Sequence, residues 1–395
     1  MKLPLDEGSI PSGPIIKERK GKKRKMDKKI FAAIATLTGT IIGAGFLGIP
    51  YVVSKSGLLI GLAYIILIGM IMIFVRFCFG EVILRTKGNH MLAGYADIYL
   101  GKIGKLFALF SVFFGVYSAL TAYLIAEGES LSFLIFGSTN YSLYLGIVFW
   151  ICLAFLSYEG LRALKKFESL SLILVLVIIA VIAFIFFPKV SMESLSYVNY
   201  ENLFVPFGVI LFSLLGTVIL PEVRRLLTGR EHEMKKALWI GGIIPIIVYA
   251  LFAIVVVGSI TNISEIATLS LGRIFVVLGI ITMFTAYFGL TISIRDIFRF
   301  DFGMGRFKGW MLACLLPLIF FLLIKIFNLA SFTEILGIAG MLGGGIEILI
   351  ILLMFERAKK LGSRKPEYII RGSIIMILLI LAFYLLGITS KLFFR

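Results

Sequence analysis

The chain has 395 residues, of which 60% are hydrophobic and 15% are charged, whereas about 25% of the residues of an ordinary soluble domain are charged. No soluble globule can hide that much apolar surface, so the composition excludes a large cytosolic enzyme, a disordered chain and a secreted disulfide scaffold. Apolar stretches of about 20 residues that do not alternate also exclude a β-barrel. The composition therefore predicts an all-α polytopic membrane protein.

Eleven apolar segments are each long enough to cross a hydrocarbon core of about 30 Å. They cover residues 28–54, 57–84, 104–135, 141–162, 167–187, 202–228, 236–259, 268–298, 309–327, 331–356 and 368–388. Residues 1–27 precede them as a basic tail, and the full length of the first apolar segment indicates a retained helix, not a cleaved signal peptide. The connections are short, so no soluble domain separates the predicted spans.

The distribution of basic residues predicts the orientation of these spans, because cytoplasmic loops carry an excess of Lys and Arg. With the N-terminus inside, 32 of the 39 Lys and Arg residues fall in cytoplasmic segments and 6 fall outside. Arg76 lies within a span, where we expect its side chain to snorkel to the interface. We therefore predict a multi-pass protein of the plasma membrane with a cytoplasmic N-terminus and an external C-terminus. The net charge of +17 indicates anionic lipid, and not nucleic acid, as the partner of the cytoplasmic face.

The residue types that support enzymatic chemistry are scarce. Cys78, Cys152 and Cys314 each lie within an apolar run and are interpreted as small buried side chains. His90 and His232 both lie in polar connections, so no histidine is available within the spans for a zinc site or a nucleophile–base pair. The sequence thus predicts a protein that is not an enzyme and has no metal or cofactor.

Two spans carry residues that interrupt a helix. The first contains glycine at three of the seven positions 39–45, followed by Gly48 and Pro50, and the sixth contains Ser213, Gly216 and Thr217 between Pro206 and Pro221. In lipid, irregular backbone is tolerated only where it lines a protein cavity, so such breaks indicate a binding site. The alternatives are close helix packing through small residues in the first span and a kinked packing helix in the sixth.

The two interrupted spans are five apart, which is the spacing of an inverted repeat of five helices. The predicted repeats are residues 28–187 and 202–356, and the segment 368–388 is then an additional eleventh helix. The tenth span is also rich in glycine, at positions 337, 340 and 343–345. Its glycines are interpreted either as packing residues or as a flexible gate beside the site.

The first span resembles a known signature. Gly39–Pro50 is similar to the first-helix motif of the aromatic and hydroxylated amino-acid permeases of the tryptophan/tyrosine type and of the related amino acid/auxin permeases, and Leu120–Tyr123 with Gly128-Glu129 is similar to their third helix. Glu81 and Tyr99–Lys102 also fit. The resemblance covers nearly the whole chain and implies the LeuT-type fold of the amino acid–polyamine–organocation superfamily, with secondary transport of amino acids. The sixth span departs from many such permeases, since Phe212–Leu215 contains no histidine.

The breaks predict how an amino acid would bind. The start of the outer half of the first span offers free N–H groups and a positive dipole end to the substrate carboxylate. Carbonyls at the end of its inner half, and others in the sixth span, suit the ammonium group. The spans that surround the breaks supply an apolar pocket, which favours a neutral substrate with an aromatic or large aliphatic side chain. The candidate binding residues are Thr38, Gly39, Thr40, Gly43, Ala44, Gly45, Phe46, Tyr117, Thr121, Phe212, Ser213, Leu215, Gly216 and Phe288.

The coupling ion has two candidate sites. Sodium-coupled relatives of this fold bind sodium through carbonyls of the first break and hydroxyls of the eighth helix, which implies Gly39, Ile42, Thr282 and Thr285 here. Carboxylates inside a membrane are expensive and mark proton pathways, and the candidates are Glu127 and Glu129, with Glu222 and Glu347 as gate residues. We expect transport by alternating access, and protons are favoured over sodium. The alternatives are a sodium-coupled symporter and an amino-acid sensor or channel.

Overall fold

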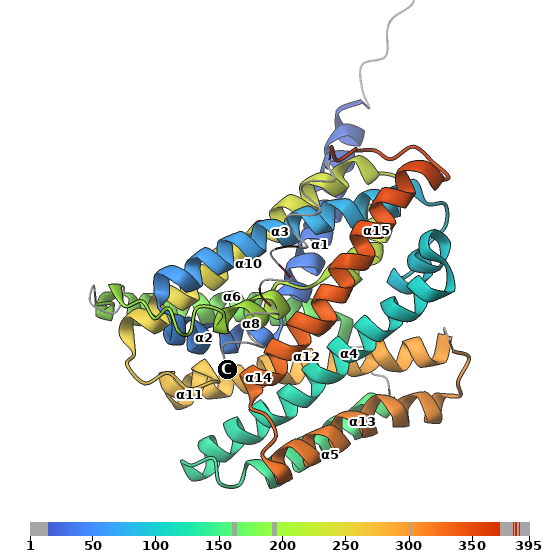
Figure 1. Ribbon diagram of the computed structural model, residues 1–395. Helices are drawn as coiled ribbons and strands as arrows, with labels where there is room; N and C mark the ends of the chain where they lie inside the picture. Colours follow the sequence, from blue (N-terminus) through green and yellow to red (C-terminus); the bar gives the residue numbers. More distant parts are fainter. Residues whose placement is uncertain are drawn as a thin grey trace, which may run out of the picture.

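The computed structural model describes residues 15–159, 164–191, 196–300 and 302–371, together with Ala382, Tyr384 and Gly387. Within these ranges the chain is helical and contains no strand (Figure 1). The described residues hold seven helices long and apolar enough to cross a bilayer, or eight when the bent pair Lys28–Ile41 and Gly45–Ser56 is taken as one span. The count of eleven spans stays a prediction.

The first half of the chain follows the predicted spans closely. Its elements are α1 (Ile15–Ile41), the 3₁₀ turn η1 (Ala44–Gly48), α2 (Ile49–Ser56), α3 (Leu58–Arg85), α4 (Leu92–Phe136), α5 (Ser142–Glu159), α6 (Leu164–Phe186) and η2 (Phe187–Lys189). Helix α1 begins before the predicted span, so the last part of the basic tail is helical. Residues 1–14 of the tail lie outside the described residues.

The second half contains more interruptions than the sequence predicts. Its elements are α8 (Val205–Ser213), η3 (Thr217–Ile219), α9 (Leu220–Leu226), η4 (Glu231–Glu233), α10 (Met234–Ser259), α11 (Ala267–Leu271), α12 (Arg273–Phe300), α13 (Arg306–Phe327), α14 (Phe332–Ile338), the π-helical turn η5 (Ala339–Gly344) and α15 (Gly345–Leu361).

Three differences from the predicted spans have local causes. The eighth span is divided at Gly272, whose φ of +109° lies in the region that favours glycine, so that α11 precedes α12 as a separate helix. The tenth span contains the turn η5, and such π-helical insertions are frequent at functional sites. The chain remains non-helical from Gly362 to Arg371, and most of the predicted span 368–388 lies outside the described residues.

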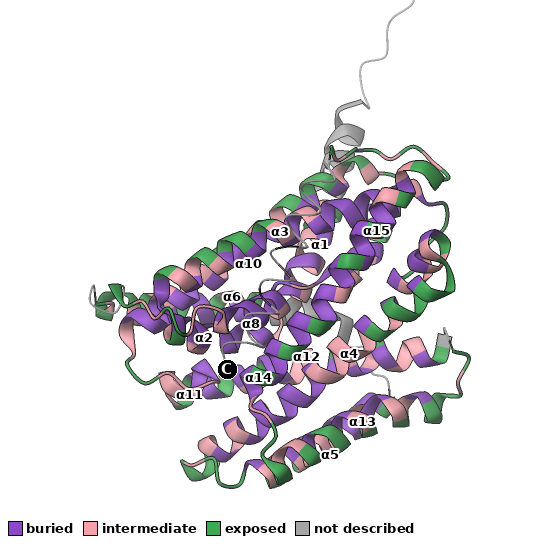
Figure 2. Ribbon diagram, viewed as in Figure 1, coloured by how far each residue is buried: buried purple, intermediate pink, exposed green. Residues whose placement is uncertain are grey.

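The helices pack in two groups around the broken helices. Helices α3 and α10 lie side by side and α10 packs against α1, whereas α4 packs against α5, α12 and α13, and α15 contacts both α3 and α4 (Figure 1). Exposed residues follow the outer sides of these helices (Figure 2), and many of them are large and apolar, such as Phe155 and Phe184. An apolar exterior is what a bilayer requires, and it leaves the polar residues of the breaks facing inward.

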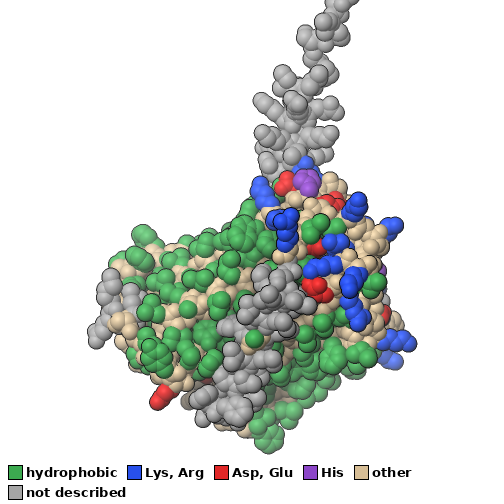
Figure 3. Space-filling model, turned by 45° about the horizontal axis from the view of Figure 1, so that its top comes forward, with side chains coloured by type: hydrophobic (Ala, Val, Ile, Leu, Met, Phe, Trp, Pro, Cys, Tyr) green, Lys and Arg blue, Asp and Glu red, His purple; other side chains and the backbone are tan. Residues whose placement is uncertain are grey.

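Basic residues gather at one end of the molecule. In Figure 3 the Lys and Arg side chains of the visible face concentrate at its upper end, and the remainder of the described surface is mostly apolar. Hydrogen bonds join the connections at this end. Lys29 donates to Thr228 O at 3.0 Å, and the N–H of Ser363 donates to Arg85 O at 2.9 Å. These are connections that the positive-inside rule assigns to the cytoplasm.

Candidate functional site

The first span is broken between Ile41 and Ala44. The N–H of Gly43 donates to Ile41 O at 2.8 Å, so it does not form the helical bond that Gly39 O would otherwise receive. The chain then continues as η1 and α2, bent by 45° from the inner half. Gly43 precedes the new turn as its N-cap residue and supplies no side-chain acceptor for its first N–H groups. The predicted interruption is therefore present, at the predicted glycines.

The sixth span is broken between Ser213 and Thr217. Helix α8 ends at Ser213, and Gly216 has a φ of +134°, which an L side chain adopts only with strain. Proline lies near the start of each half, at Pro206 and Pro221, where its missing N–H costs nothing. Glycine at the break and proline at the helix starts thus explain why this span divides here.

The two breaks touch each other. A Cβ atom placed on Gly216 would lie 2.7 Å from Cγ1 of Ile41, and one placed on Gly45 would lie 3.1 Å from both the Phe212 ring and Ser213 Oγ. The backbones can approach this closely only because both positions are glycine. The structure therefore brings together four of the predicted site residues, Gly45, Phe212, Ser213 and Gly216.

A tyrosine that the sequence analysis missed links the breaks. Tyr249 of α10 is fully buried, and its hydroxyl lies 2.8 Å from Ile41 O and 3.0 Å from Ser213 O. The single hydroxyl proton is thus shared between the last carbonyl of α1 and the last carbonyl of α8. Each helix ends there, so neither carbonyl accepts a helical N–H, and Ile41 O accepts the N–H of Gly43 in addition. Nothing in the sequence pairs a seventh-span tyrosine with either break.

Arg76 does not snorkel, which corrects the sequence prediction. Its side chain is fully buried, and Nη2 donates to Leu214 O in the sixth-span break. A Cβ atom on Gly242 of α10 would lie 3.3 Å from Nη1, so the guanidinium faces the protein interior. The Ser213 and Leu214 carbonyls, which lie where a substrate ammonium was expected to bind, therefore already have protein donors.

Other predicted binding residues have different environments. Phe46 turns toward α10, with ring centroids 5.3 Å from Phe252 and 6.3 Å from Tyr249. Tyr117 was predicted to face the breaks. Its hydroxyl instead donates to Leu312 O of α13 at 3.2 Å. The hydroxyls of three predicted residues donate to backbone carbonyls of their own or a neighbouring helix, namely Thr38, Thr40 and Thr121. Phe288 is buried in α12.

Tyr123 approaches the first break from α4. A Cβ atom on Gly43 would lie 3.7 Å from the Tyr123 hydroxyl, and this tyrosine is buried. Tyr123 belongs to the third-span pattern Leu120–Tyr123 and is not among the predicted site residues. It lies two residues after Thr121, so the two side chains project from different faces of α4.

The candidate ion and gate residues separate into paired and unpaired groups. Glu129 forms an ion pair with Lys325 at 3.0 Å, and Glu222 forms one with Arg225 of its own helix at 2.8 Å. Because Glu222 is paired within α9, it does not connect two elements as a gate would. Its neighbour Arg224 does so instead, since Nη1 donates to three carbonyls at the end of α3 and beyond, those of Ile83, Thr86 and Gly88.

Two buried carboxylates have no ion-pair partner among the described residues. Glu127 is fully buried, and neither of its carboxylate oxygens has a hydrogen bond among the described residues. Glu347 is 5% exposed and its Oε1 also lacks a hydrogen bond. The candidate sodium hydroxyls differ from these carboxylates, because Thr282 donates to Gly279 O and Thr285 donates to Thr282 O. Both hydroxyls donate their proton and keep their oxygen lone pairs, which is compatible with binding a cation.

The glycines of the tenth span bring it against the sixth. A Cβ atom on Gly340 would collide with Gly208 O, and one on Gly208 would collide with Gly337 O. Further along, a Cβ atom on Gly344 would lie 3.1 Å from the Leu215 side chain. These contacts support the packing interpretation of the tenth span and place η5 beside the sixth-span break.

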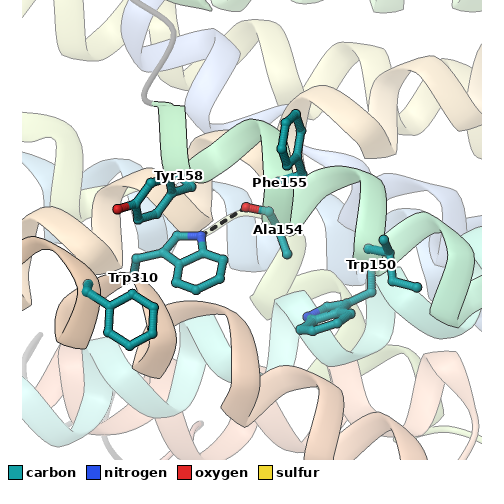
Figure 4. A pocket seen from close by; sticks show the side chains of 7 residues that line it. Trp150, Ala154, Phe155, Tyr158 and Trp310 are labelled. Carbon is teal, nitrogen blue, oxygen red and sulfur yellow. Dashed lines mark hydrogen bonds between the residues drawn. The ribbon is translucent and has the colours of Figure 1, made fainter.

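A surface groove of about 420 Å³ lies away from the breaks, between α5 and α13. Figure 4 shows Trp150, Phe155, Tyr158 and Trp310 around it, with the Trp310 indole N–H donating to Ala154 O at 2.9 Å. Its walls are aromatic and apolar, and Phe155 is 71% exposed. Such a groove on a helix face turned toward the bilayer differs from the enclosed polar backbone that an amino acid requires.

Comparisons with known proteins agree with this geometry. Residues 26–269 match the profile of the tryptophan/tyrosine permease family. The chain is 23% identical to tyrosine-specific transport system 2 of Haemophilus influenzae, over 90% of this chain and 94% of that protein. It is also 23% identical to glutamine transporter 2 of Aliivibrio fischeri, over 85% and 90% of the two chains.

A solved structure shares the fold. The inward-facing conformation of Mhp1 matches with a TM-score of 0.56 and 15% identity, covering 81% of this chain and 75% of that one. This match and the two breaks show an all-α membrane protein of the LeuT type. The profile match extends over more than half of the sequence. The chain therefore belongs to the tryptophan/tyrosine permease family and is a multi-pass amino-acid transporter.

Proposed function

We propose that this transporter moves neutral amino acids with aromatic or large aliphatic side chains into the cell together with protons, by alternating access at the two helix breaks. The observation that carries the proposal is the contact between the breaks, where Gly45 meets Phe212 and Ser213. A substrate carboxylate would bind the first N–H groups of η1, which no side chain caps. The Phe212 ring, which is partly exposed, would contact the substrate side chain.

The substrate ammonium requires acceptors that the protein has not used. Ser213 O and Leu214 O accept from Tyr249 and Arg76, whereas Gly39 O lacks its helical donor because Gly43 N–H is directed to Ile41 O. We therefore place the ammonium at the end of α1, near Gly39. An aromatic substrate accords with the relatives named as tyrosine-specific, and the relative named as a glutamine transporter makes glutamine a second substrate to test.

Protons are proposed as the coupling ion because buried carboxylates are present. Glu127 and Glu347 are buried in α4 and α15. The hydroxyls of Thr282 and Thr285 donate within α12 and keep their lone pairs, so sodium is the alternative that the uptake experiment tests. In the proposed orientation the N-terminus and the basic face are cytoplasmic and the C-terminus is external. Anionic lipid would contact the basic face.

The test is uptake into proteoliposomes of purified protein. Labelled tyrosine, tryptophan, phenylalanine, leucine and glutamine are offered singly under an inward pH gradient without sodium, under a sodium gradient at equal pH, and with no gradient. We expect tyrosine to accumulate under the pH gradient alone. Accumulation under the sodium gradient alone would replace the proton by sodium. Saturable binding with no flux under any gradient would instead support an amino-acid sensor.

A further inference from the structure

Arg76 and Glu347 both lie beside the sixth-span break, because Arg76 donates to Leu214 O and Gly344, three residues before Glu347, lies against the Leu215 side chain. They come from α3 and α15, two helices that pack together, and their side chains are 0% and 5% exposed. The guanidinium and the carboxylate act on each other electrostatically, yet no direct ion pair joins them. Arg76 Nη2 instead donates to Leu214 O, and its Nε and Nη1 have no hydrogen-bond partner among the described residues, like Glu347 Oε1.

Few other titratable groups surround this pair. Tyr249 of α10 acts on Arg76, and its hydroxyl is directed to the break carbonyls. Tyr384 lies against Gly345 and donates to Met341 O. Among the described residues Arg76 is the charged side chain that acts on Glu347. The charge of Glu347 is therefore balanced by Arg76.

The arrangement fits a neutral Glu347. A buried carboxylate beside a guanidinium gains most from a direct, bidentate ion pair, because burial strengthens the attraction and leaves unpaired charge costly. Arg76 makes a hydrogen bond to the Leu214 carbonyl in place of that ion pair. A protonated Glu347 does not attract the guanidinium in this way, so Arg76 can donate to Leu214 O in the break.

We propose that Glu347 binds the proton that drives transport, and that Arg76 transmits the charge of Glu347 to the sixth-span break. This inference rests on the proposed proton-coupled uptake. A proton from the outside converts the Glu347 carboxylate to the acid, and Arg76 then holds Leu214 O while the substrate is bound. When the proton leaves to the cytoplasm, the carboxylate draws Arg76 away from Leu214 O, the break loosens and the affinity for the substrate falls.

Glu127 lacks the partner that such a cycle requires. No cation acts on it among the described residues, and both its oxygens are unbonded. An isolated carboxylate in a low-dielectric interior stays protonated, because ionisation there costs far more than in water. Glu347, by contrast, has a balancing charge in its ionised form and can both bind and release the proton.

The experiment compares Glu347→Gln with Glu127→Gln in proteoliposomes, using labelled tyrosine. Two readouts are taken: accumulation under an inward pH gradient, and exchange of external label for internal unlabelled tyrosine at equal pH. One coupled proton sustains an accumulation of about tenfold per pH unit. We expect Glu347→Gln to lose this accumulation, with a ratio falling to about one, and to keep exchange within about twofold. Glu127→Gln, which resembles the protonated acid, should keep both.

Gradient-driven accumulation that survives in Glu347→Gln overturns the assignment, and so does its selective loss in Glu127→Gln. Binding of labelled tyrosine to detergent-purified protein gives a second measurement that does not require a full transport cycle. Wild-type affinity should rise at mildly acidic pH, and the affinities of Glu347→Gln and of the neutral pair Arg76→Gln/Glu347→Gln should not change with pH. An unchanged pH dependence in Glu347→Gln refutes the role of this residue. If the wild type exchanges tyrosine but never couples it to protons, the proposed coupling itself fails.

Discussion

Replacing Tyr249 by phenylalanine removes the hydroxyl that links the two helix breaks and leaves the ring in place. The hydroxyl lies 2.8 Å from Ile41 O and 3.0 Å from Ser213 O, in a fully buried position. The ring retains its stacking against Phe46. The substitution therefore tests the hydrogen bonds separately from the packing.

The magnitude follows from Ser213 O, which loses its donor, whereas Ile41 O keeps the hydrogen bond from Gly43 N–H. A buried polar group left without a hydrogen bond costs about 1–3 kcal/mol, and the one hydroxyl proton cannot fully satisfy both acceptors at once. If this free energy is lost from the substrate-bound arrangement of the breaks, the dissociation constant for tyrosine rises about 5-fold to 150-fold. We expect the Tyr249→Phe protein to be folded and inserted, with weakened binding.

The assay is equilibrium binding of labelled tyrosine to purified protein, with uptake kinetics as a parallel measurement. Tyr144→Phe is the matched control, because it removes the same hydroxyl from an exposed tyrosine on α5 that is 66% exposed. Wild-type affinity in both variants would show that the link between the breaks contributes nothing to the binding site. Equal weakening in both would show that the effect is not specific to the breaks.

Further substitutions test other contacts of the fold. Replacing Gly45 by leucine should abolish uptake with normal membrane levels, because a Cβ atom at this position would lie only 3.1 Å from the Phe212 ring. Unchanged uptake would remove the first break from the site. Arg224→Ala removes a buried donor to three carbonyls. It should lower the apparent melting temperature of the purified protein more than Arg224→Lys does, and equal melting temperatures in the two variants would contradict this role. Glu129→Gln breaks a partly exposed ion pair with Lys325, so we expect a stability loss of no more than about 1 kcal/mol and an uptake rate near that of the wild type.

The positions of the helix breaks could be predicted from the sequence because their cause is local. Gly43 and Gly216 lie at the two interruptions, and Pro206 and Pro221 lie near the starts of the helical halves, where proline is tolerated. The interruption of the eighth span at Gly272 has the same cause. It was missed because one glycine in an apolar run is also compatible with a continuous helix.

The side chains that complete the breaks could not be predicted, because their contacts join distant parts of the chain. Arg76 and Leu214 are 138 residues apart, and Tyr249 and Ile41 are 208 residues apart. Helix α3 is apolar on nearly every face, so its sequence does not indicate which side Arg76 occupies. The expectation of snorkelling assumed a face toward lipid, whereas α10 and the break of α8 cover that residue. Tyr117 was assigned to the pocket for a similar reason, and its hydroxyl reaches α13 instead.

A broken helix inside a membrane provides a place for a substrate, and it also leaves backbone carbonyls that need hydrogen-bond donors. Each carbonyl at a helix end must find a donor, since no water of the bilayer core can supply one. Here Tyr249 and Arg76 meet that demand at Ile41, Ser213 and Leu214, so the sixth-span break is held largely by the protein itself. The groups left for an amino acid are concentrated in the first break, where η1 begins without a side-chain cap. A substrate that binds there contacts Phe212 and Ser213 across the gap, and the donors that hold the sixth break then determine whether that contact persists.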